Sequence, residues 1–177
     1  MENSVVGAYL WKLSLHLEEI LAQSKALVRA AQAVRRSNLV LTMGNGGSSS
    51  TAQHLAQGLC DVGVRAICLT DNTALLTALS NDESYEEALS WQVRTYAHNR
   101  KSITSVLISA SGNSPNILSA ARCAVESKAK TIGLTGFGGG KLKELVDISI
   151  ILSSKDYGIV EDLHLATCHI ICKLVQK

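Results

Sequence analysis

Residues 44–51 hold three glycines followed by four hydroxyl-bearing residues. The stretch comes after the apolar run 39–41 and leads into a helical pattern. A buried strand, a glycine-rich turn and hydroxyls entering a helix place free N–H and O–H donors at a helix N terminus, where anions bind. The stretch lacks the lysine of a P-loop and the glycine spacing of the dinucleotide fingerprint, so it predicts a phosphate site rather than a nucleotide site. A turn of this kind can also serve packing alone.

A second loop of small residues follows a later apolar run. Its sequence is Ser109-Ala110-Ser111-Gly112-Asn113-Ser114-Pro115. Ser114 before Pro115 is typical of a helix N-cap followed by proline at the first helical position. Two such loops at neighbouring strand ends predict one enclosed phosphate, held by backbone N–H groups and serine hydroxyls. The structural alternative is that Ser114 only caps a helix and Ser111 only forms a turn.

Short apolar runs alternate with helical patterns along the chain. Strands are predicted at 38–43, 65–70, 102–109, 130–135 and 147–152. Helices are predicted at 50–62, 74–80, 85–96, 115–127, 141–145 and 159–175. This alternation indicates an α/β fold with a doubly wound, five-stranded parallel sheet covered on both faces. Ligands of such sheets bind beyond the carboxyl ends of the strands, so the loops after residues 43, 70, 109 and 135 are predicted to line the site.

The segment 3–34 repeats apolar residues at spacings of three and four, which predicts one long helix or two helices in tandem. Its apolar face is wider than one small sheet can cover. We therefore expect it to pack on a neighbouring subunit, and packing within the chain is the alternative.

Composition narrows the class of protein. With 46% hydrophobic and 18% charged residues, the 177-residue chain is predicted to be a single domain, 1–177, with a substantial core. A formal net charge of +2 and no stripe of Lys or Arg argue against direct nucleic-acid binding. Five cysteines without a CxxC pair predict free thiols in a reducing compartment. The sequence has no signal region and no apolar run near about 18 residues, so neither export nor membrane insertion is expected, and a cytoplasmic location is predicted.

Separated motifs occur in a fixed order along nearly the whole chain. They are Gly44-Asn45-Gly46-Gly47-Ser48, Asn81-Asp82, Ser109-x-Ser111-Gly112-Asn113-Ser114, Leu134-Thr135-Gly136 and a final helix with His164 and His169. Together they resemble the sugar isomerase (SIS) domain, and within it the phosphoheptose isomerases. The resemblance implies a flavodoxin-like α/β domain, a homotetramer in which the helical segment 1–36 packs between subunits, and a phosphorylated sugar as ligand. Enzymes of this family interconvert sedoheptulose 7-phosphate and a D-glycero-D-manno-heptose 7-phosphate.

Carried across by motif, the resemblance assigns phosphate binding to four serines, Ser48, Ser109, Ser111 and Ser114. It places Asn45 and Asp82 near the sugar hydroxyls, and Gly46 and Asn113 in the loops around the substrate. Aldose–ketose isomerisation needs a base that moves a proton between C1 and C2 and an acid that serves the oxygens. The family uses a histidine of the last helix, matched by His169, and a glutamate in the helix after the first glycine loop.

That glutamate is missing in this chain. The family pattern His-Phe-Ala-Glu-Glu-Leu appears as His54-Leu55-Ala56-Gln57-Gly58-Leu59, which puts Gly58 at the catalytic position. Glycine inside a helix costs up to about 1 kcal/mol relative to alanine, so it suggests space or close approach at this point. A compensating carboxylate is Glu161, where these isomerases usually have glutamine. Glu161 and His169 are eight residues apart, about 80° around a helix, so we expect both to face one pocket as the acid–base pair.

Some family members bind zinc through residues matched here by His54, Glu161 and His169, together with the missing glutamate. Two histidines and a carboxylate with an open position make a catalytic zinc arrangement, so either zinc is bound or no cofactor is required. The alternatives are that His54 packs or caps, that Glu161 is a solvated first-turn acid, and that His169 is a core histidine. His164 projects about 140° away from His169 and is predicted to be structural or at a subunit contact. Asp61, on the same face as His54, is a fallback carboxylate.

Two functions from different classes remain open. The first is an isomerase of phosphorylated sugars, with His169 and Glu161 as acid and base. The second is a non-catalytic binding or scaffold protein, because the DnaA initiator-associating protein also resembles phosphoheptose isomerase and also lacks the glutamate. The presence of both Glu161 and His169 favours the enzyme. A sensor of sugar phosphate for some other module is less favoured, since no DNA-binding or kinase module is apparent.

Overall fold

Five apolar runs form one parallel sheet. The computed structural model describes residues 2–176, and the strands run in the order β2-β1-β3-β4-β5 with every neighbouring pair parallel. They are β1 (Leu39–Met43), β2 (Ala66–Cys68), β3 (Ile103–Ser109), β4 (Lys130–Thr135) and β5 (Ile148–Ile151). The central strand β3 is buried along its whole length, as expected of a sheet covered on both faces. The predicted fold class is confirmed, and the strand order is the flavodoxin-like one.

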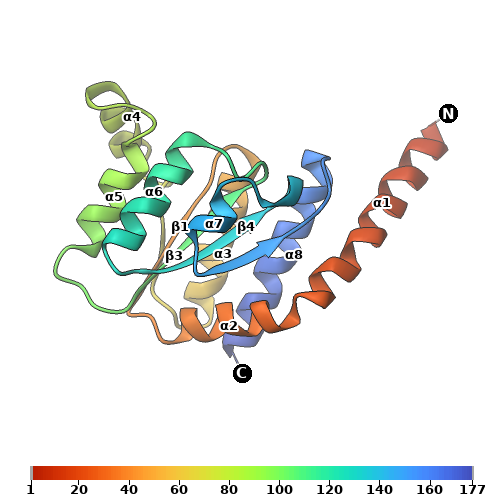
Figure 1. Ribbon diagram of the computed structural model, residues 1–177, viewed down its shortest axis with the longest axis horizontal. Coiled ribbons are helices and arrows are strands. Elements are labelled where there is room, and N and C mark those ends of the chain that lie inside the picture. The colour runs from red at the N-terminus through yellow and green to blue at the C-terminus, as the bar shows by residue number, and fades with distance from the viewer. Residues whose placement is uncertain (1, 177) are drawn as a thin grey trace.

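Helices cover both faces of the sheet (Figure 1). They are α1 (Glu2–Ala22), α2 (Ser24–Arg35), α3 (Gly47–Asp61), α4 (Thr73–Asp82), α5 (Ala88–Ala97), α6 (Pro115–Glu126), α7 (Leu142–Leu145) and α8 (Tyr157–Gln176), with a 3-10 turn η1 (Phe137–Gly139). One apolar core joins the sheet to α2, α3 and α8, and a second joins it to α5, α6 and α7. The strand order reverses between β1 and β3, and a ligand crevice forms at such a switch point.

The N-terminal segment consists of two helices in tandem, which is one of the two predicted alternatives. They meet at Gln23, whose side-chain amide pairs with β5 in the manner of a neighbouring strand. Gln23 Nε2 donates to the Ile151 carbonyl oxygen (2.7 Å), and Gln23 Oε1 accepts from the Ile151 N–H (2.9 Å). These two bonds pair with Ile151 at the open edge of β5 and anchor the junction between α1 and α2 to the sheet. α2 then turns its apolar face into the core.

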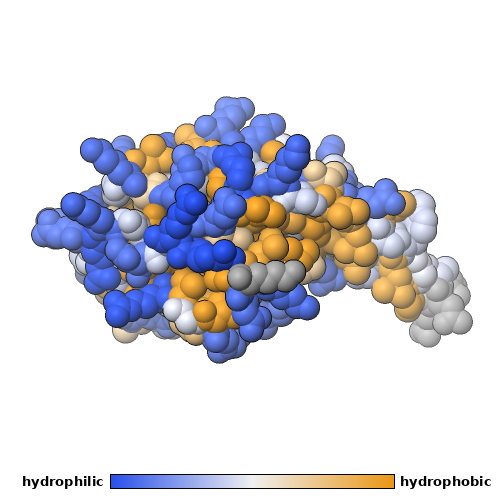
Figure 2. Space-filling view, turned by 90° about the horizontal axis from the view of Figure 1, so that it is seen from below, coloured by the Kyte–Doolittle hydropathy of each residue, from blue (hydrophilic) through white to orange (hydrophobic). Residues whose placement is uncertain are grey.

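α1 extends away from the sheet and keeps most of its apolar side chains in solvent (Figures 1 and 2). Leu10, Trp11 and Leu21 are 58%, 62% and 74% exposed. Tyr9 ties the helix to α8 by donating a hydrogen bond to Asp162 Oδ2 (2.7 Å). A contiguous apolar surface of this kind marks an interaction site. Within residues 2–176, no helix is long and apolar enough to cross a membrane.

Some element boundaries depart from the prediction. α3 starts at Gly47 instead of residue 50, which brings Ser48 into its first turn. α5 starts at Ala88 instead of residue 85, because the preceding residues form a turn in which Glu87 N–H donates to Ser84 Oγ (3.1 Å). β2 is shorter than predicted, since this edge strand pairs with β1 alone. The strand ends that carry the glycine and serine loops, at residues 43, 109 and 135, lie where the sequence predicts.

Candidate active site

The loop after β1 is shaped by its glycines. A Cβ at Gly44 would lie 2.3 Å from the Ser48 carbonyl oxygen, so the chain can fold back onto α3 only with glycine there. Gly46 has φ +53°, which glycine adopts without strain, and the space beside it is open. No hydrogen bond among the described residues engages the backbone N–H groups of Gly47 and Ser48. Free donors at the positive end of a helix are suited to binding an anion, and the anion cradle stays a prediction here.

The loop after β3 brings two serine hydroxyls together. Ser109 is buried at the end of β3, and its Oγ lies 3.2 Å from Ser114 Oγ. Ser114 occupies the N-cap position of α6, as predicted, but its side chain makes no capping hydrogen bond. The alternative in which Ser114 only caps the helix therefore does not hold. Ser111 does form a turn, since its Oγ accepts from Asn113 N–H (3.2 Å).

Glycine also lets the loops after β3 and β4 lock together. Gly112 has φ +64°, and a Cβ there would lie 2.1 Å from the Gly139 carbonyl oxygen. The Gly112 carbonyl accepts from Leu142 N–H (2.9 Å). Asn113 Oδ1 accepts from Lys141 N–H (3.0 Å). Asn113 thus links the loop after β3 to the loop after β4, and the two loops form one continuous rim at the carboxyl edge of the sheet.

Asn45 is held by two residues that the sequence did not single out. Its amide exchanges two hydrogen bonds with the buried Asn116 of α6, at 2.9 Å and 2.8 Å. Tyr85 Oη also donates to Asn45 Oδ1 (2.8 Å). These contacts join the first glycine loop to the helix of the second loop and to the segment after α4. The partners are 71 and 40 residues apart, so local sequence patterns do not predict these contacts. The one signal is that Asn116 follows Pro115 and Tyr85 follows the Asn81-Asp82 motif.

Asp82 ends α4 and is exposed. Its Oδ1 accepts a hydrogen bond from Asn81 Nδ2 (2.9 Å). Tyr85, three residues later, connects this segment to the first glycine loop through its hydrogen bond to Asn45.

Two predicted site histidines are in contact. The rings of His54 on α3 and His169 on α8 meet edge to face, with centroids 4.8 Å apart and planes at 74°. Both residues are exposed, so the alternative of His169 as a core histidine does not hold. An imidazole that substrate can reach is suited to proton transfer.

Glu161 lies away from this histidine pair, at the start of α3. A Cβ on Gly47 would lie 2.3 Å from Glu161 Oε2, so the carboxylate packs against the first residue of α3. Eight residues of helix separate Glu161 from His169, a rise of about 12 Å. Both face α3 from the same side of α8, as predicted, but Glu161 sits beside the anion cradle and His169 beside His54.

Gly58 lies one turn beyond His54, where the family resemblance puts a glutamate. A Cβ at Gly58 would meet Cys172 Sγ at 3.1 Å, which agrees with the expectation of close approach at this glycine. Burial, followed by the nearby Asp61 carboxylate, raises the pKa of the Cys172 thiol. The position at which the family resemblance places a glutamate, Gly58 in this chain, is thus bordered by a neutral thiol.

The predicted zinc ligands do not assemble into one group. In residues 2–176, no three His, Cys, Asp or Glu side chains are placed to hold a metal ion together. His54 and His169 are adjacent, but Glu161 packs at Gly47, and the fallback carboxylate Asp61 accepts a hydrogen bond from Gln57. Two imidazoles without a third ligand do not fit a catalytic zinc centre, so we derive no step through a metal.

His164 belongs to the core rather than to the site. It is 1% exposed, and its ring lies beside the Thr135 backbone, with neither ring nitrogen hydrogen-bonded to any residue in the described range 2–176. Burial lowers the pKa of His164 to about 4, so the ring is neutral in the folded protein. Of the two predicted roles, the structural one is correct.

Comparison with known proteins agrees with this geometry. A model of the SIS domain family matches residues 8–136. The phosphoheptose isomerase of Aliarcobacter butzleri is 38% identical over 159 residues, which cover 86% of this chain and 83% of that protein. The chain belongs to the phosphoheptose isomerase family of SIS domain proteins.

Solved phosphoheptose isomerases share the fold over its whole length. The enzyme from Neisseria gonorrhoeae superposes with a TM-score of 0.92 at 29% identity, covering 99% of this chain and 98% of its own. The enzyme from Francisella tularensis gives the same TM-score and identity with 100% of both chains covered. The tandem N-terminal helices are therefore part of the phosphoheptose isomerase fold.

Proposed function

We propose that this phosphoheptose isomerase-family protein interconverts sedoheptulose 7-phosphate and D-glycero-D-manno-heptose 7-phosphate. The observation that carries the proposal is the meeting of two glycine- and serine-rich loops at one edge of the sheet, each at a helix N terminus. The named relatives, at 29–38% identity, are phosphoheptose isomerases, and this supports the C7 sugar class.

The phosphate group binds between the N termini of α3 and α6. Backbone N–H groups at Gly47 and Ser48 and the adjacent hydroxyls of Ser109 and Ser114 supply donors from both sides. Ser111 completes the serine set. Hydrogen bonds to a charged phosphate are stronger than those to neutral acceptors, so a few fixed donors suffice.

The sugar hydroxyls extend from the phosphate toward Asn45 and Asp82. Asn116 and Tyr85 fix the orientation of the Asn45 amide, so this side chain meets the substrate without first losing freedom of rotation. Asp82, being exposed next to Tyr85, supplies a carboxylate acceptor for a hydroxyl.

The reaction moves one proton between two carbons. In the ketose-to-aldose direction a base removes a proton from C1 while the O2 carbonyl gains a proton, which gives an enediol. A proton then returns to C2 and O1 loses its proton, so charge and atoms balance. We assign the carbon-to-carbon transfer to His169, which is exposed on α8.

The second proton-transfer group has two candidates. Glu161 is the carboxylate expected from the sequence, on the same side of α8 as His169. His54 is the group in ring contact with His169, at 4.8 Å. Gly58 offers no carboxylate, and Glu161 lies at the phosphate end of the proposed site whereas His54 lies beside His169, so His54 is better placed to serve the oxygens on C1 and C2. Separate variants of Glu161 and His54 distinguish them.

Zinc enters this proposal as an addition to be tested. Two neighbouring imidazoles are common first ligands for this ion. Because residues 2–176 place no third ligand beside them, we expect turnover to be independent of added zinc, and a dependence on zinc would contradict this expectation.

We further infer a homotetramer that acts in the cytoplasm. The exposed apolar side chains of α1 support assembly, because they would otherwise remain in water. The five cysteines are all free, which suits a reducing compartment. Light scattering tests the assembly, and a monomer would contradict it.

The non-catalytic scaffold is the second candidate function, and the substitution at Gly58 is the observation that favours it. The comparisons do not favour it, since the relatives named above are isomerases. The deciding experiment incubates the protein with C5 to C7 phosphosugars, including sedoheptulose 7-phosphate, with and without zinc, and follows loss of ketose. Turnover of the C7 ketose supports the isomerase. No turnover across the panel, together with specific capture of a protein partner, would support the scaffold.

A further inference from the structure

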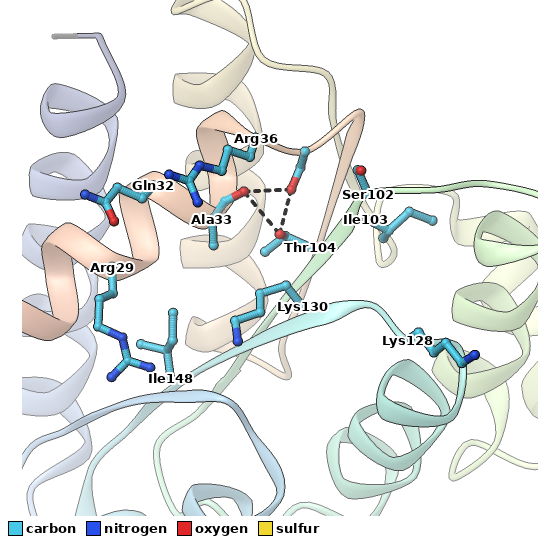
Figure 3. A pocket seen from close by; sticks show the side chains of 11 residues that line it. Arg29, Gln32, Ala33, Arg36, Ser102, Ile103, Thr104, Lys128, Lys130 and Ile148 are labelled. Carbon is cyan, nitrogen blue, oxygen red and sulfur yellow. Dashed lines mark hydrogen bonds between the residues drawn. The ribbon is translucent and has the colours of Figure 1, made fainter.

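A cavity of about 370 Å³ lies at the amino-terminal edge of the sheet, at the other end of the strands from the candidate active site (Figure 3). It is bordered by the second half of α2 and by the first residues of β3, β4 and β5. Four cationic side chains line it: Arg29, Arg36, Lys128 and Lys130. Hydrogen bonds that join Ser37 Oγ to Thr104 Oγ1 (2.6 Å) and to the Ala33 carbonyl (2.9 Å) close its inner end.

Negative charge at this cavity falls well short of the positive charge. Among the described residues, Asp147 is the one acidic residue that forms an ion pair with a lining cation, at 3.0 Å from Lys130 Nζ. Arg29 Nη2 donates to the backbone carbonyl of Asp147 (3.4 Å), not to a carboxylate. Of the four lining cations, Lys130 is the one that is paired with a carboxylate among the described residues.

Helix dipoles account for only part of this charge. Arg36 and Lys128 follow the C termini of α2 and α6, where a cation compensates free carbonyl groups. Arg29 lies in the middle of α2, and Lys130 begins β4, so no helix end explains either. Figure 3 shows both side chains extending toward the same space.

The backbone at Lys128 points to a role beyond folding. Lys128 has φ +59° and follows the C-cap of α6, and the bonds from Lys128 N–H to Val125 and from Ala129 N–H to Ala124 complete a Schellman motif. Glycine is the usual residue there, because a side chain strains the left-handed conformation. Ser102, which also lines the cavity, has φ +60°. Lys128 and Ser102 are two of the four non-glycine residues with positive φ among the described residues, and both border this cavity.

We propose that this cavity is a second anion site, which binds a small molecule carrying two or more phosphate groups. Its volume lies in the range of small-molecule pockets. Arg29 of α2, Arg36 just after α2 and Lys130 of β4 border it, and Lys128 lies at its edge in the loop between α6 and β4, so separate positive charges are available to more than one phosphate group. A second hollow of about 400 Å³ shares Lys128 and Lys130, which leaves room for the rest of a larger ligand.

The site is separate from the phosphosugar cradle. β3 connects the two, with Ile103 at the cavity and Ser109 at the cradle, about 20 Å apart along the strand. The inference does not depend on the isomerase activity, since none of the four cations belongs to the candidate active site.

Calorimetric titration of the full chain with tripolyphosphate and pyrophosphate tests the proposal. The double variant R29Q/K130Q should bind tripolyphosphate at least about tenfold more weakly, because two charged contacts are lost. The matched control K25Q removes an exposed cation one turn earlier on α2 and should bind within about twofold of wild type. To separate the two sites, the titration is repeated on S109A/S114A, which should keep tripolyphosphate binding.

The variant K128G distinguishes a ligand-binding lysine from a structural one. Glycine relieves the left-handed strain, so the thermal midpoint should rise while tripolyphosphate affinity falls. The proposal is overturned if wild type does not bind tripolyphosphate, if R29Q/K130Q binds it unchanged, or if S109A/S114A loses it. Binding of a long oligonucleotide with no response to tripolyphosphate would instead make this edge a nucleic-acid surface, and would also overturn the proposal.

Discussion

The two edges of the sheet present different kinds of group to an anion. At the carboxyl edge, the loops 44–51 and 109–115 contain no Lys or Arg, and their donors are helix N–H groups and serine hydroxyls. At the amino edge, a cavity is lined by four cations and bordered by the C-terminal ends of helices. Fixed dipoles recognise the shape of one phosphate group, whereas mobile cations respond to total charge. In our proposals the two edges are connected by one strand, β3, with a phosphosugar site at its carboxyl end and a charge-driven anion site at its amino end.

The largest predicted effect is a loss of kcat, and it distinguishes the proton-transfer groups at the carboxyl edge from the phosphate-binding groups. H169A should lower kcat about 10²- to 10⁴-fold and leave phosphosugar affinity largely intact, because a proton-transfer group is lost while the phosphate cradle stays. Steady-state kinetics together with a binding titration measure both quantities. E161Q and H54A serve as matched variants, and the one with the larger loss of kcat identifies the second proton-transfer group. Activity that survives H169A would refute our assignment.

Acid should weaken the fold at the core beneath the carboxyl edge. His164 has a pKa lowered to about 4 by burial, against about 6.5 when unfolded, so the unfolded chain binds the extra proton between these values. Stability is complete above about pH 6.5 and falls as pH drops toward 4, by about 3 kcal/mol in total from this group. Denaturant unfolding across this pH range measures the slope. H164L removes the ionisable ring and should flatten this part of the profile, and an unchanged slope would show that other groups cause it.

Removing serine hydroxyls from the loop after β3 should weaken phosphosugar binding, and this binding should depend little on salt concentration. S109A/S114A removes two hydroxyls that lie 3.2 Å apart and should weaken phosphosugar binding about 10- to 100-fold, as expected for lost hydrogen bonds to a charged group. S49A is the control, because Ser49 Oγ bonds to Thr70 Oγ1 instead (2.6 Å). Wild-type phosphosugar affinity should change less with ionic strength than tripolyphosphate affinity does. Equal salt dependence would remove the contrast between the two edges.

The smallest effect concerns stability at the amino edge. The Lys130–Asp147 ion pair has side chains 44% and 41% exposed, so K130Q should cost less than about 1 kcal/mol of unfolding free energy. Urea denaturation checks this value, with K25Q as the reference. A loss of several kcal/mol would mean that Lys130 holds the fold, and weaker anion binding in its variants would then need another explanation.

The sequence predicted the parts of the fold that depend on local pattern. Apolar runs ending at residues 43, 109 and 135 gave the strand ends and hence the edge that carries the glycine loops. Two helix starts shifted in opposite directions: α3 begins three residues earlier than predicted, at Gly47, and α5 begins three residues later, at Ala88. Serine and glycine have low intrinsic helix propensity, so the early start of α3 follows from tertiary packing rather than from local preference.

The candidate site was less predictable, because its contacts join distant residues. Tyr85 and Asn116 hold Asn45 across 40 and 71 residues, and their positions after the Asn81-Asp82 motif and after Pro115 are the one sign of these contacts in the sequence. The helical angle correctly put Glu161 and His169 on one side of α8, but it ignored the rise between them. The basic cavity was missed for a similar reason, since Arg29 and Lys130 approach only through the strand order.

Solvent exchange during turnover reports whether this chain forms an enediol from a C7 ketose phosphate. The protein is incubated with sedoheptulose 7-phosphate in D2O, and NMR follows both the aldose and deuterium at its C2. We predict aldose formation with deuterium entering at C2, because an enediol intermediate exchanges its proton with the acid–base group and solvent. Folded protein that binds the phosphosugar but yields neither aldose nor exchange would contradict the claim that this chain, with glycine at position 58, is an isomerase.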